Sequence, residues 1–244
     1  MNYPISTVIA AAGRGSRSGV PYPKCLHEVN GKVILASLME SLPDKSDQIT
    51  IIASPSGRME IEDFLIEFNL SARIVVQEEP RGMGNAILQL QKIDKSLQPE
   101  IFLAWGDLPF ISKDTVTKLI NFHFNNRNDF SFVTFFTDKA YTEVSRDTFG
   151  NIISVIETRE IKDKSNKIKA GERDIGIFLF KKDLILKYLS LDLENSIGAV
   201  TQEHGFLYLI EHLVNDNFKV GSIETNNTQE SISFNSLQDI SNLE

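Results

Sequence analysis

The sequence has little cysteine, no long apolar run and no excess of positive charge. Its single cysteine, Cys25, excludes an internal disulfide and any zinc site built from several cysteines. It contains no run of about 18 apolar residues and no signal-peptide pattern, so we expect an unanchored, cytoplasmic protein. A formal net charge of −8 argues against surfaces that neutralise nucleic-acid phosphates or anionic lipids. We therefore expect neither a nucleic acid nor a membrane as a partner.

Internal repeats and long low-complexity tracts are also missing, and what is present suits an ordinary globular enzyme. The chain has 244 residues, of which 41% are hydrophobic and 24% charged. That length is enough for one large α/β domain with a substantial core. We expect a single domain over residues 1–244, with a nucleotide-binding half up to about residue 125 and an acceptor-binding half from about 126 onward. The oligomeric state stays open.

Apolar runs rich in β-branched residues alternate with stretches of helical period. This alternation predicts a Rossmann-like α/β fold, with a mixed, mostly parallel sheet and helices on both faces. The expected strands are 5–11, 49–53, 72–76, 101–105, 130–136, 152–156, 175–180 and 218–223. The expected helices are 33–42, 61–68, 83–97, 116–124, 183–189, 203–214 and a short one near the end. The polar stretch 162–169 is expected to be a solvated loop.

The loop after the first strand combines glycines with cations. Because ligands bind outside the carboxyl ends of parallel strands, this loop lies where a ligand is expected. Glycines let the backbone approach an anion, and the cations suit the charge of a triphosphate. These residues are Gly13, Gly15, Gly19, Arg14, Arg17 and Lys24.

Two common phosphate loops do not fit this segment. The Walker pattern requires Gly-Lys-Ser/Thr after its second glycine, which is absent. The dinucleotide fingerprint requires a third glycine where Ser18 stands, and the prolines at 21 and 23 oppose an immediate long helix. Dinucleotide binding is therefore disfavoured.

The motif Ala11-Ala12-Gly13-x-Gly15-Ser16-Arg17, followed by Pro23-Lys24, resembles the signature of the sugar-nucleotide pyrophosphorylases. Within that family it is most similar to the N-terminal uridylyltransferase domain of bacterial N-acetylglucosamine-1-phosphate uridyltransferases. The resemblance implies the nucleotide-diphospho-sugar transferase fold with a small acceptor-binding lobe. It also implies that Arg17 and Lys24 bind the triphosphate and stabilise charge as pyrophosphate leaves. The nucleotide-binding residues that it implies in this motif are Ala11, Ala12, Gly13, Gly15 and Ser16.

The same resemblance implies a base site and a metal site. Gln77 and Gly82 match a segment that reads the base, although Met83 replaces the usual threonine. Asp107, in Trp-Gly-Asp-Leu-Pro, matches the aspartate that binds Mg²⁺, and one carboxylate plus substrate phosphates is a common way to hold this ion. The second metal ligand is expected to be Asn235, with Asn226 as the competing assignment.

In the acceptor half, Gly150, Glu157 and Asp174 match positions that hold the sugar. Asp174 replaces an asparagine of the family pattern. A carboxylate only accepts hydrogen bonds, so it suits hydroxyls or a cationic group better than an acetamido carbonyl. This substitution argues against N-acetylglucosamine 1-phosphate as the acceptor.

These features predict an Mg²⁺-dependent nucleotidyltransferase that transfers a nucleoside monophosphate from a nucleoside triphosphate, with UTP or CTP favoured, to a sugar 1-phosphate. Its partners are then the triphosphate and a small phosphorylated metabolite. One alternative is a CTP-dependent cytidylyltransferase that acts on a phospho-alcohol or another capsule or lipid precursor. The other is a regulator that binds nucleotide without turnover. The hexapeptide-repeat domain of the bifunctional uridyltransferases is absent from this sequence, so acetyl transfer is not expected.

Overall fold

The structure is a computed structural model that describes residues 3–13, 18–43, 49–161 and 170–240. The expected solvated loop at 162–169 lies outside the described residues. Within them, no helix is long and apolar enough to cross a membrane.

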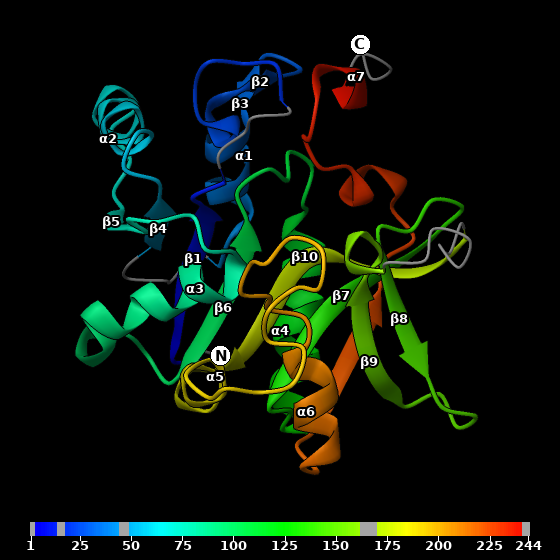
Figure 1. The fold of residues 1–244 in the computed structure, drawn as a ribbon. Coiled ribbons are helices and arrows are strands. Elements are labelled where there is room, and N and C mark those ends of the chain that lie inside the picture. Colours follow the sequence, from blue (N-terminus) through cyan, green and yellow to red (C-terminus); the bar gives the residue numbers. More distant parts are fainter. Residues whose placement is uncertain (1–2, 14–17, 44–48, 162–169, 241–244) are drawn as a thin grey trace.

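A seven-stranded sheet forms the centre of the protein (Figure 1), in the order β11-β7-β10-β6-β1-β4-β5. Strands β4, β1 and β6 are parallel, as are β4 and β5, and β7 and β11, whereas β10 runs antiparallel to both of its neighbours. The first six residues of β1 are buried, which is typical of a central strand covered on both faces. The predicted mixed, mostly parallel sheet is therefore confirmed, and strands from both halves of the chain share it.

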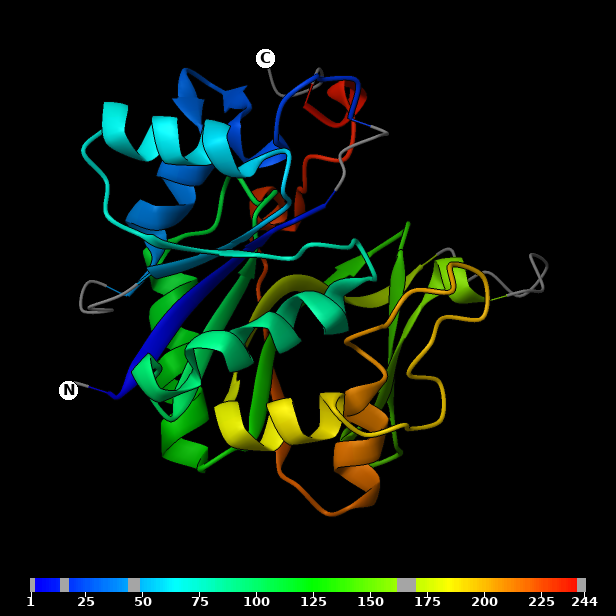
Figure 2. The same cartoon turned by 60° about the vertical axis from the view of Figure 1, so that its left-hand side comes forward.

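Helices cover both faces of the sheet (Figures 1 and 2), and each face has its own apolar core. One core packs α3, α5 and α6 against the sheet and the β8–β9 hairpin. The other packs α1, α2 and α4 against the opposite face. The strands are β1 (Ile5–Ala11), β2 (Glu28–Val29), β3 (Lys32–Val33), β4 (Ile49–Ala53), β5 (Arg73–Val76), β6 (Glu100–Trp105), β7 (Phe130–Thr137), β8 (Thr142–Arg146), β9 (Ile152–Glu157), β10 (Gly171–Lys181) and β11 (Val220–Glu224). The α-helices are α1 (Ile34–Ser41), α2 (Arg58–Glu67), α3 (Met83–Leu88), α4 (Lys113–Asn126), α5 (Lys182–Leu189), α6 (Leu209–Asn215) and α7 (Leu237–Ile240).

Two expected helices are shorter than the sequence pattern suggests. After Leu88 the chain continues as a 3₁₀ helix, Gln89–Ser96, and the Gln89 side chain donates to the Asn85 carbonyl at 3.0 Å. That carbonyl is the acceptor that an α-helical N–H of Gln89 would use. The helix expected over 203–214 begins only at Leu209, because the preceding residues pack against another loop.

That preceding segment, residues 196–205, is called the strap below. It folds back on itself, with Gly205 N–H donating to the Ser196 carbonyl at 2.9 Å. His204 then bonds to the loop before α3: its N–H donates to the Arg81 carbonyl at 2.7 Å, and its carbonyl accepts from Gly84 N–H at 3.0 Å. Backbone groups committed to these bonds cannot also form a helical ladder. The helical pattern was therefore the wrong interpretation for 203–208.

Strand β10 contains an irregularity next to Trp105. Its register against β7 shifts between Asp174 and Phe178, and Gly176 adopts a left-handed backbone with φ of +83°. A Cβ added to Gly176 would lie 2.1 Å from Trp105 Cδ1. The bulge therefore makes room for the indole, a use of bulges that is common near functional sites.

We predict that Gly176→Ala lowers the free energy of unfolding by roughly 2–4 kcal/mol, because overpacking and a left-handed alanine each have a cost. Gly150→Ala is the matched control: Gly150 has φ of +87°, but nothing lies within 4 Å of its added Cβ. The free energy of unfolding of Gly150→Ala should fall only by the cost of a left-handed alanine, about 1–2 kcal/mol. Denaturant unfolding measures both. Equal losses in the two variants would contradict the steric argument.

Candidate active site

The carboxyl ends of β1 and β6 lie side by side and bring two motifs together. In the parallel register Ala10 is the partner of Trp105, and Gly106 N–H donates to the Ala10 carbonyl at 2.9 Å. The glycine-rich loop therefore leaves the sheet beside Gly106-Asp107. Of the loop residues expected to bind phosphate, Arg14, Gly15, Ser16 and Arg17 lie outside the described residues, whereas Ala11, Ala12, Gly13 and Lys24 are described.

Lys24 joins two of the predicted metal-binding residues. Its Nζ lies 3.8 Å from Asp107 Oδ2 and donates to Asn235 Oδ1 at 3.2 Å. One cation thus contacts a carboxylate oxygen and an amide oxygen that are far apart in the sequence. The competing residue, Asn226, is exposed and is not among the residues that line the cavities described below.

The position of Asn235 follows from the residue before it. Phe234 is fully buried with Val29 and Ile34, and its N–H donates to the Asp107 carbonyl at 2.8 Å. The His27 ring stacks on Phe234 with centroids 4.3 Å apart, so this histidine packs against the same buried ring. The insertion of Phe234 therefore holds Asn235 beside Asp107.

A buried carboxylate anchors the same C-terminal segment. Glu230 is 1% exposed and accepts hydrogen bonds from Ser112 Oγ at 2.6 Å, Thr115 Oγ1 at 2.8 Å and Thr225 Oγ1. Ser112 also caps α4 by accepting from Thr115 N–H at 3.2 Å. Several donors on one carboxylate offset the cost of burying its charge. Glu230 thus ties the segment before Asn235 to the start of α4.

Burial raises the pKa of two acidic groups near Lys24. It raises the pKa of Asp107, and the Lys24 ammonium opposes that rise only in part. Burial also raises the pKa of the Cys25 thiol to about 12, so this thiol stays protonated near neutral pH. The buried Cys25 therefore acts as a small apolar side chain of the core.

The larger cavity, of about 1040 Å³, lies between the glycine-rich loop, the loop before α3 and the strap. Gln77 lines it but is only 4% exposed, and its Nε2 donates to the Gly82 carbonyl and to Asn85 Oδ1, each at 3.0 Å. Asn85, which the sequence did not single out, also lines the cavity. The amide nitrogen of Gln77 is therefore used to shape the loop around the cavity.

Gly82 and Gly84 pack tightly against the strap. A Cβ on Gly82 would lie 2.5 Å from the His204 carbonyl oxygen, and one on Gly84 would lie 2.0 Å from that of Gly205. Gly82 also has φ of +98°. In the structure, the close approach that these glycines permit is made by the strap backbone.

A second cavity, of about 420 Å³, adjoins the first and reaches Asp107 and Asn235. It is lined by the rings of Trp105 and Tyr141 and by Glu157 and Asp174. Burial raises the pKa of Glu157, and the neighbouring Arg159 opposes that rise. Glu157 and Asp174, two of the three predicted acceptor-binding residues, therefore share one cavity with both predicted metal ligands.

Asp174 is 1% exposed, and both of its carboxylate oxygens are in use. Oδ1 accepts from Thr142 Oγ1 at 2.7 Å, and Oδ2 accepts from Gly176 N–H at 2.9 Å. The second bond fixes the left-handed turn against which Trp105 lies. Asp174 thereby shapes the wall of the cavity that it lines.

Gly150, the third predicted acceptor residue, does not join this group. It lies in the turn between β8 and β9, whereas Glu157 is at the opposite end of β9. A strand of this length spans about 20 Å. Gly150 is also absent from the lining of both cavities. The structure thus gives it the role of a positive-φ turn glycine.

The donor set at the junction of the cavities fits a magnesium ion. Asp107 and Asn235 offer hard oxygens, and both already contact the same ammonium. No group of three or more histidine, cysteine or acidic residues that could hold a metal occurs among the described residues. Any ion here would therefore need oxygens from the substrates, which is how Mg²⁺ is usually held at phosphate sites.

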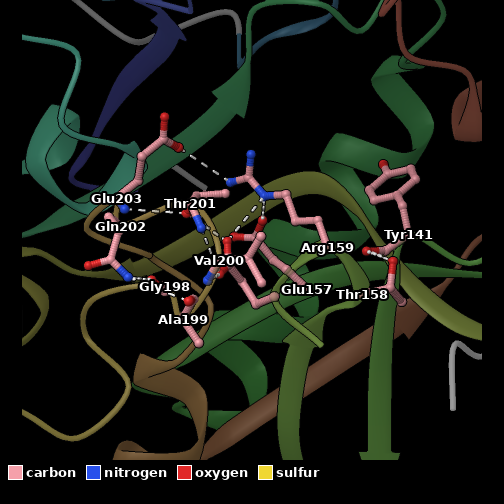
Figure 3. Close-up of polar contacts among 11 residues, drawn as sticks. Tyr141, Glu157, Thr158, Arg159, Gly198, Ala199, Val200, Thr201, Gln202 and Glu203 are labelled. Carbon is pink, nitrogen blue, oxygen red and sulfur yellow. Dashed lines mark hydrogen bonds and ion pairs between the residues drawn. The ribbon is translucent and has the colours of Figure 1, made fainter. Parts of the chain in front are cut away.

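Arg159 is a candidate residue that the sequence analysis missed. It lies two residues beyond the end of β9 and forms ion pairs with Glu157 at 2.5 Å and Glu203 at 3.7 Å (Figure 3), and a longer one with Glu160 at 3.8 Å. Nothing in the charged sequence around Arg159 indicates that this arginine lies beside the two cavities. The strap, which supplies Glu203, was hidden by the helical pattern discussed above.

Comparison with known proteins agrees with this fold and places the chain among the nucleotidyltransferases. The MobA-like NTP transferase domain model matches residues 7–164, more than half of the chain. The chain belongs to this family.

Curated relatives include the Bifunctional protein GlmU of Caldanaerobacter subterraneus subsp. tengcongensis, which is 26% identical over 98% of this chain and 50% of its own length. The GlmU protein of Zymomonas mobilis subsp. mobilis is 27% identical over 68% of this chain and 37% of its own length. The chain thus spans about half or less of the length of these relatives.

Solved structures share the fold. A candidate glucose-1-phosphate thymidylyltransferase of Bacillus anthracis, in complex with sucrose, superimposes with a TM-score of 0.72 at 19% identity, covering 91% of this chain and 87% of the other. The inositol-1-phosphate CTP transferase of T. maritima gives 0.67 at 15% identity, with coverage of 90% and 84%. The nucleotide-diphospho-sugar transferase fold expected from the sequence is confirmed.

We predict that Asp174→Asn stabilises the fold at neutral pH. Burial raises the pKa of Asp174, so its charge destabilises the folded state above that pKa and ceases to do so as the pH falls through it. The amide can still accept from Gly176 N–H and donate to Thr142 Oγ1. The melting temperature of the variant should exceed that of the wild type at pH 8, and the difference should shrink as the pH falls toward the ordinary pKa of an aspartate.

Thr142→Val is the control, because it removes one donor and leaves the buried charge. It should melt below the wild type at pH 8. If Asp174→Asn melts below the wild type at pH 8, the proposed cost of the buried carboxylate is wrong.

Proposed function

We propose that this protein is an Mg²⁺-dependent nucleotidyltransferase that transfers a nucleoside monophosphate from UTP or CTP to a sugar 1-phosphate and releases pyrophosphate. The observation that carries this proposal is the junction of two cavities at Lys24, Asp107 and Asn235. The larger cavity has the size of a nucleotide site, and the smaller suits a compact phosphorylated acceptor.

The chemistry is an in-line displacement. An oxygen of the acceptor's phosphate forms a bond to the α-phosphorus, the bond from that phosphorus to the bridging oxygen breaks, and pyrophosphate leaves with the electron pair. Lys24 and Arg17 stabilise the charge on the leaving group. Asp107 and Asn235 hold Mg²⁺, which when bound offsets the charge of both phosphates. A phosphate dianion needs no strong general base, so positioning and charge stabilisation are sufficient.

Each cavity has a proposed ligand. In the larger one, Ala12, Gly13 and Gly82 line the space for the nucleotide, and Gln77 keeps a carbonyl oxygen for the base, while Ala11 lines the smaller cavity beside it. In the smaller one, Glu157 accepts hydrogen bonds from acceptor hydroxyls. Asp174 stabilises the wall of the smaller cavity by accepting hydrogen bonds from Thr142 and Gly176.

A second candidate keeps the chemistry and changes the acceptor to a phospho-alcohol used with CTP. It is favoured by the carboxylate of Glu157 and by the absence of any asparagine or glutamine other than Asn235 from the described lining of the smaller cavity. Such a lining recognises hydroxyls or a cationic group more readily than an acetamido carbonyl.

The test is pyrophosphate release with Mg²⁺, with each nucleoside triphosphate paired with a panel of sugar 1-phosphates and phospho-alcohols. Release that needs one triphosphate, one acceptor and the metal would establish the reaction and identify the acceptor class. Triphosphate binding without release across the panel would favour a nucleotide-binding regulator. Failure to bind any triphosphate would end the proposal.

We predict that Lys24→Ala and Asp107→Asn each lower kcat by roughly 10²–10³-fold, the usual effect of removing one preorganised group that stabilises transition-state charge. Lys32→Ala is the control for Lys24, because Lys32 is an exposed lysine paired with Glu40. It should retain wild-type kcat in the pyrophosphate assay. Equal loss in Lys24→Ala and Lys32→Ala would place the effect outside the site.

We also predict that Asn235→Ala raises the Mg²⁺ concentration for half-maximal activity by roughly tenfold or more, while Asn226→Ala leaves it unchanged. Asn235 contributes the oxygen that contacts Lys24, whereas Asn226 is exposed outside the cavities. Magnesium titration of initial rates distinguishes the two residues. The reverse result would reassign the ligand to Asn226.

A further inference from the structure

Arg173 is a buried arginine of β10 that lines neither of the two cavities. Two contacts of its guanidinium are described: Nη2 donates to the Ser231 carbonyl, and the group lies over the Tyr141 ring, 4.2 Å from the ring centroid. Neither partner carries a negative charge, and Nε is buried without a hydrogen-bond partner among the described residues. A carbonyl and a ring face offset only part of the cost of burying a cation, so fold stability alone does not explain this arginine.

Both contacts lead to the segment that precedes Asn235. The Ser231 carbonyl belongs to this segment and accepts the hydrogen bond of Arg173 directly. Tyr141 reaches the segment as well, because its side chain hydrogen-bonds to that of Ser233. Arg173 therefore holds this segment at two points, once by its own hydrogen bond and once through the ring on which it stacks.

The backbone of Tyr141 is held by Thr158, the residue after β9. The Tyr141 carbonyl accepts from Thr158 N–H at 2.9 Å and from Thr158 Oγ1 at 3.0 Å (Figure 3). The tyrosine can then move only about the bonds of its own side chain. Because a cation is attracted to the face of an aromatic ring, the stacked guanidinium favours one orientation of that side chain.

Ser233 in turn orients the amide of Asn235. Asn235 Nδ2 donates to Ser233 Oγ at 2.9 Å, and Asn235 Oδ1 accepts from Lys24 Nζ at 3.2 Å. An ammonium group can only donate, so the oxygen of the amide must face Lys24. Asn235 is exposed, and burial therefore does not restrict its side chain. The Ser233 hydroxyl restricts it instead, because it holds the nitrogen and leaves the oxygen on the side of Lys24.

We propose that Arg173 is a positioning residue that turns the Asn235 amide oxygen toward the proposed metal site. The contacts run from the guanidinium to the Tyr141 ring, then to the Ser233 hydroxyl and then to the amide. This inference rests on the proposed function. Phe234 anchors the backbone of the segment, whereas these contacts orient a side chain. Removing an outer group that orients a metal ligand commonly costs roughly 10–100-fold in metal affinity.

The test measures Mg²⁺ affinity apart from turnover. The α,β-methylene analogue of UTP or CTP, whichever binds, is titrated by calorimetry at a series of Mg²⁺ concentrations. Arg173→Met should raise the Mg²⁺ concentration for half-maximal tightening by roughly tenfold or more, and it should leave analogue affinity without Mg²⁺ unchanged. Methionine replaces the cation with an unbranched, adaptable apolar side chain, so the space in β10 stays filled.

A second measurement follows the segment without any ligand. Hydrogen exchange of residues 231–236 should be faster in Arg173→Met by roughly 10–100-fold, which corresponds to the loss of one hydrogen bond to a charged group. Ser233→Ala keeps the bond between Arg173 and Ser231 but removes the partner of the Asn235 amide. It should reproduce the shift in Mg²⁺ concentration and change hydrogen exchange much less.

Arg146→Met is the matched control. Arg146 also binds to β10, where it pairs with Glu172, but within the described chain it contacts neither Tyr141 nor residues 231–235. It should keep the wild-type Mg²⁺ dependence and hydrogen exchange. Arg173→Lys keeps the charge but lacks the planar group that stacks on the ring, so it should give intermediate values.

The outcomes separate this inference from the function on which it rests. If the analogue binds but Arg173→Met keeps the wild-type Mg²⁺ dependence, Arg173 has only a structural role and the proposed function stands. Equal changes in Arg146→Met would reflect general loosening of β10 and would also overturn the inference. If Arg173→Met does not fold, a wild-type Mg²⁺ dependence in both Ser233→Ala and Arg173→Lys overturns it. If no analogue binds to the wild type, or if binding ignores Mg²⁺, the proposed function fails and the inference fails with it.

Discussion

The parallel pairing of β1 with β6 is the constraint on which the candidate site depends. It aligns Ala10 with Trp105, so the glycine-rich loop and the Gly106-Asp107 turn leave the sheet at one edge. The two backbones lie close together: a Cβ on Gly106 would lie 3.1 Å from the Ala10 carbonyl oxygen. Lys24 can meet Asp107 only because both segments begin from this shared edge.

The site is completed by a segment from the far end of the chain. Asn235 and Lys24 are 211 residues apart, so the contact requires a long-range closure. This contact depends on two residues outside the cavities. Phe234 packs in an apolar cluster, and Glu230 accepts hydrogen bonds from hydroxyl groups near the start of α4. Both belong to the stable body of the fold, which allows an exposed asparagine to be held without its own burial.

The sequence predicted the parts of the fold that depend on local pattern. Buried β-branched runs such as Ile5–Ala11 gave the central strands, and the residues around Lys24 and Asp107 pointed to one edge of the sheet. It did not predict the strap, because the helical spacing over 203–208 was overridden by backbone bonds to Arg81 and Gly84. Strand β8 was missed for a similar reason: Thr142–Arg146 is short and polar, and it is a strand because it pairs with β9.

Roles at the candidate site were harder to predict than positions. Asp174 was expected from its place in a motif, and it does line the acceptor cavity. Its burial and its bonds to Thr142 and Gly176 are properties of the folded chain, and they make it a support for the cavity wall. Gly150 matched a motif equally well, yet its φ of +87° belongs to a turn at the other end of β9. Sequence spacing does not distinguish these two cases, because both depend on where the hairpin lies relative to β10.

Charge balance explains why the cations of this site are paired with carboxylates. The chain has a net charge of −8, and the proposed reaction joins two anions. Unpaired lysine and arginine side chains at the junction would repel each other and would lose much rotamer entropy on binding. Asp107 and Asn235 orient Lys24, and Glu157 and Glu203 orient Arg159, before any ligand arrives. The partial exposure of these pairs keeps each ion pair weak. An acidic protein can thus hold two preorganised cations at one site while its overall charge disfavours nucleic acids.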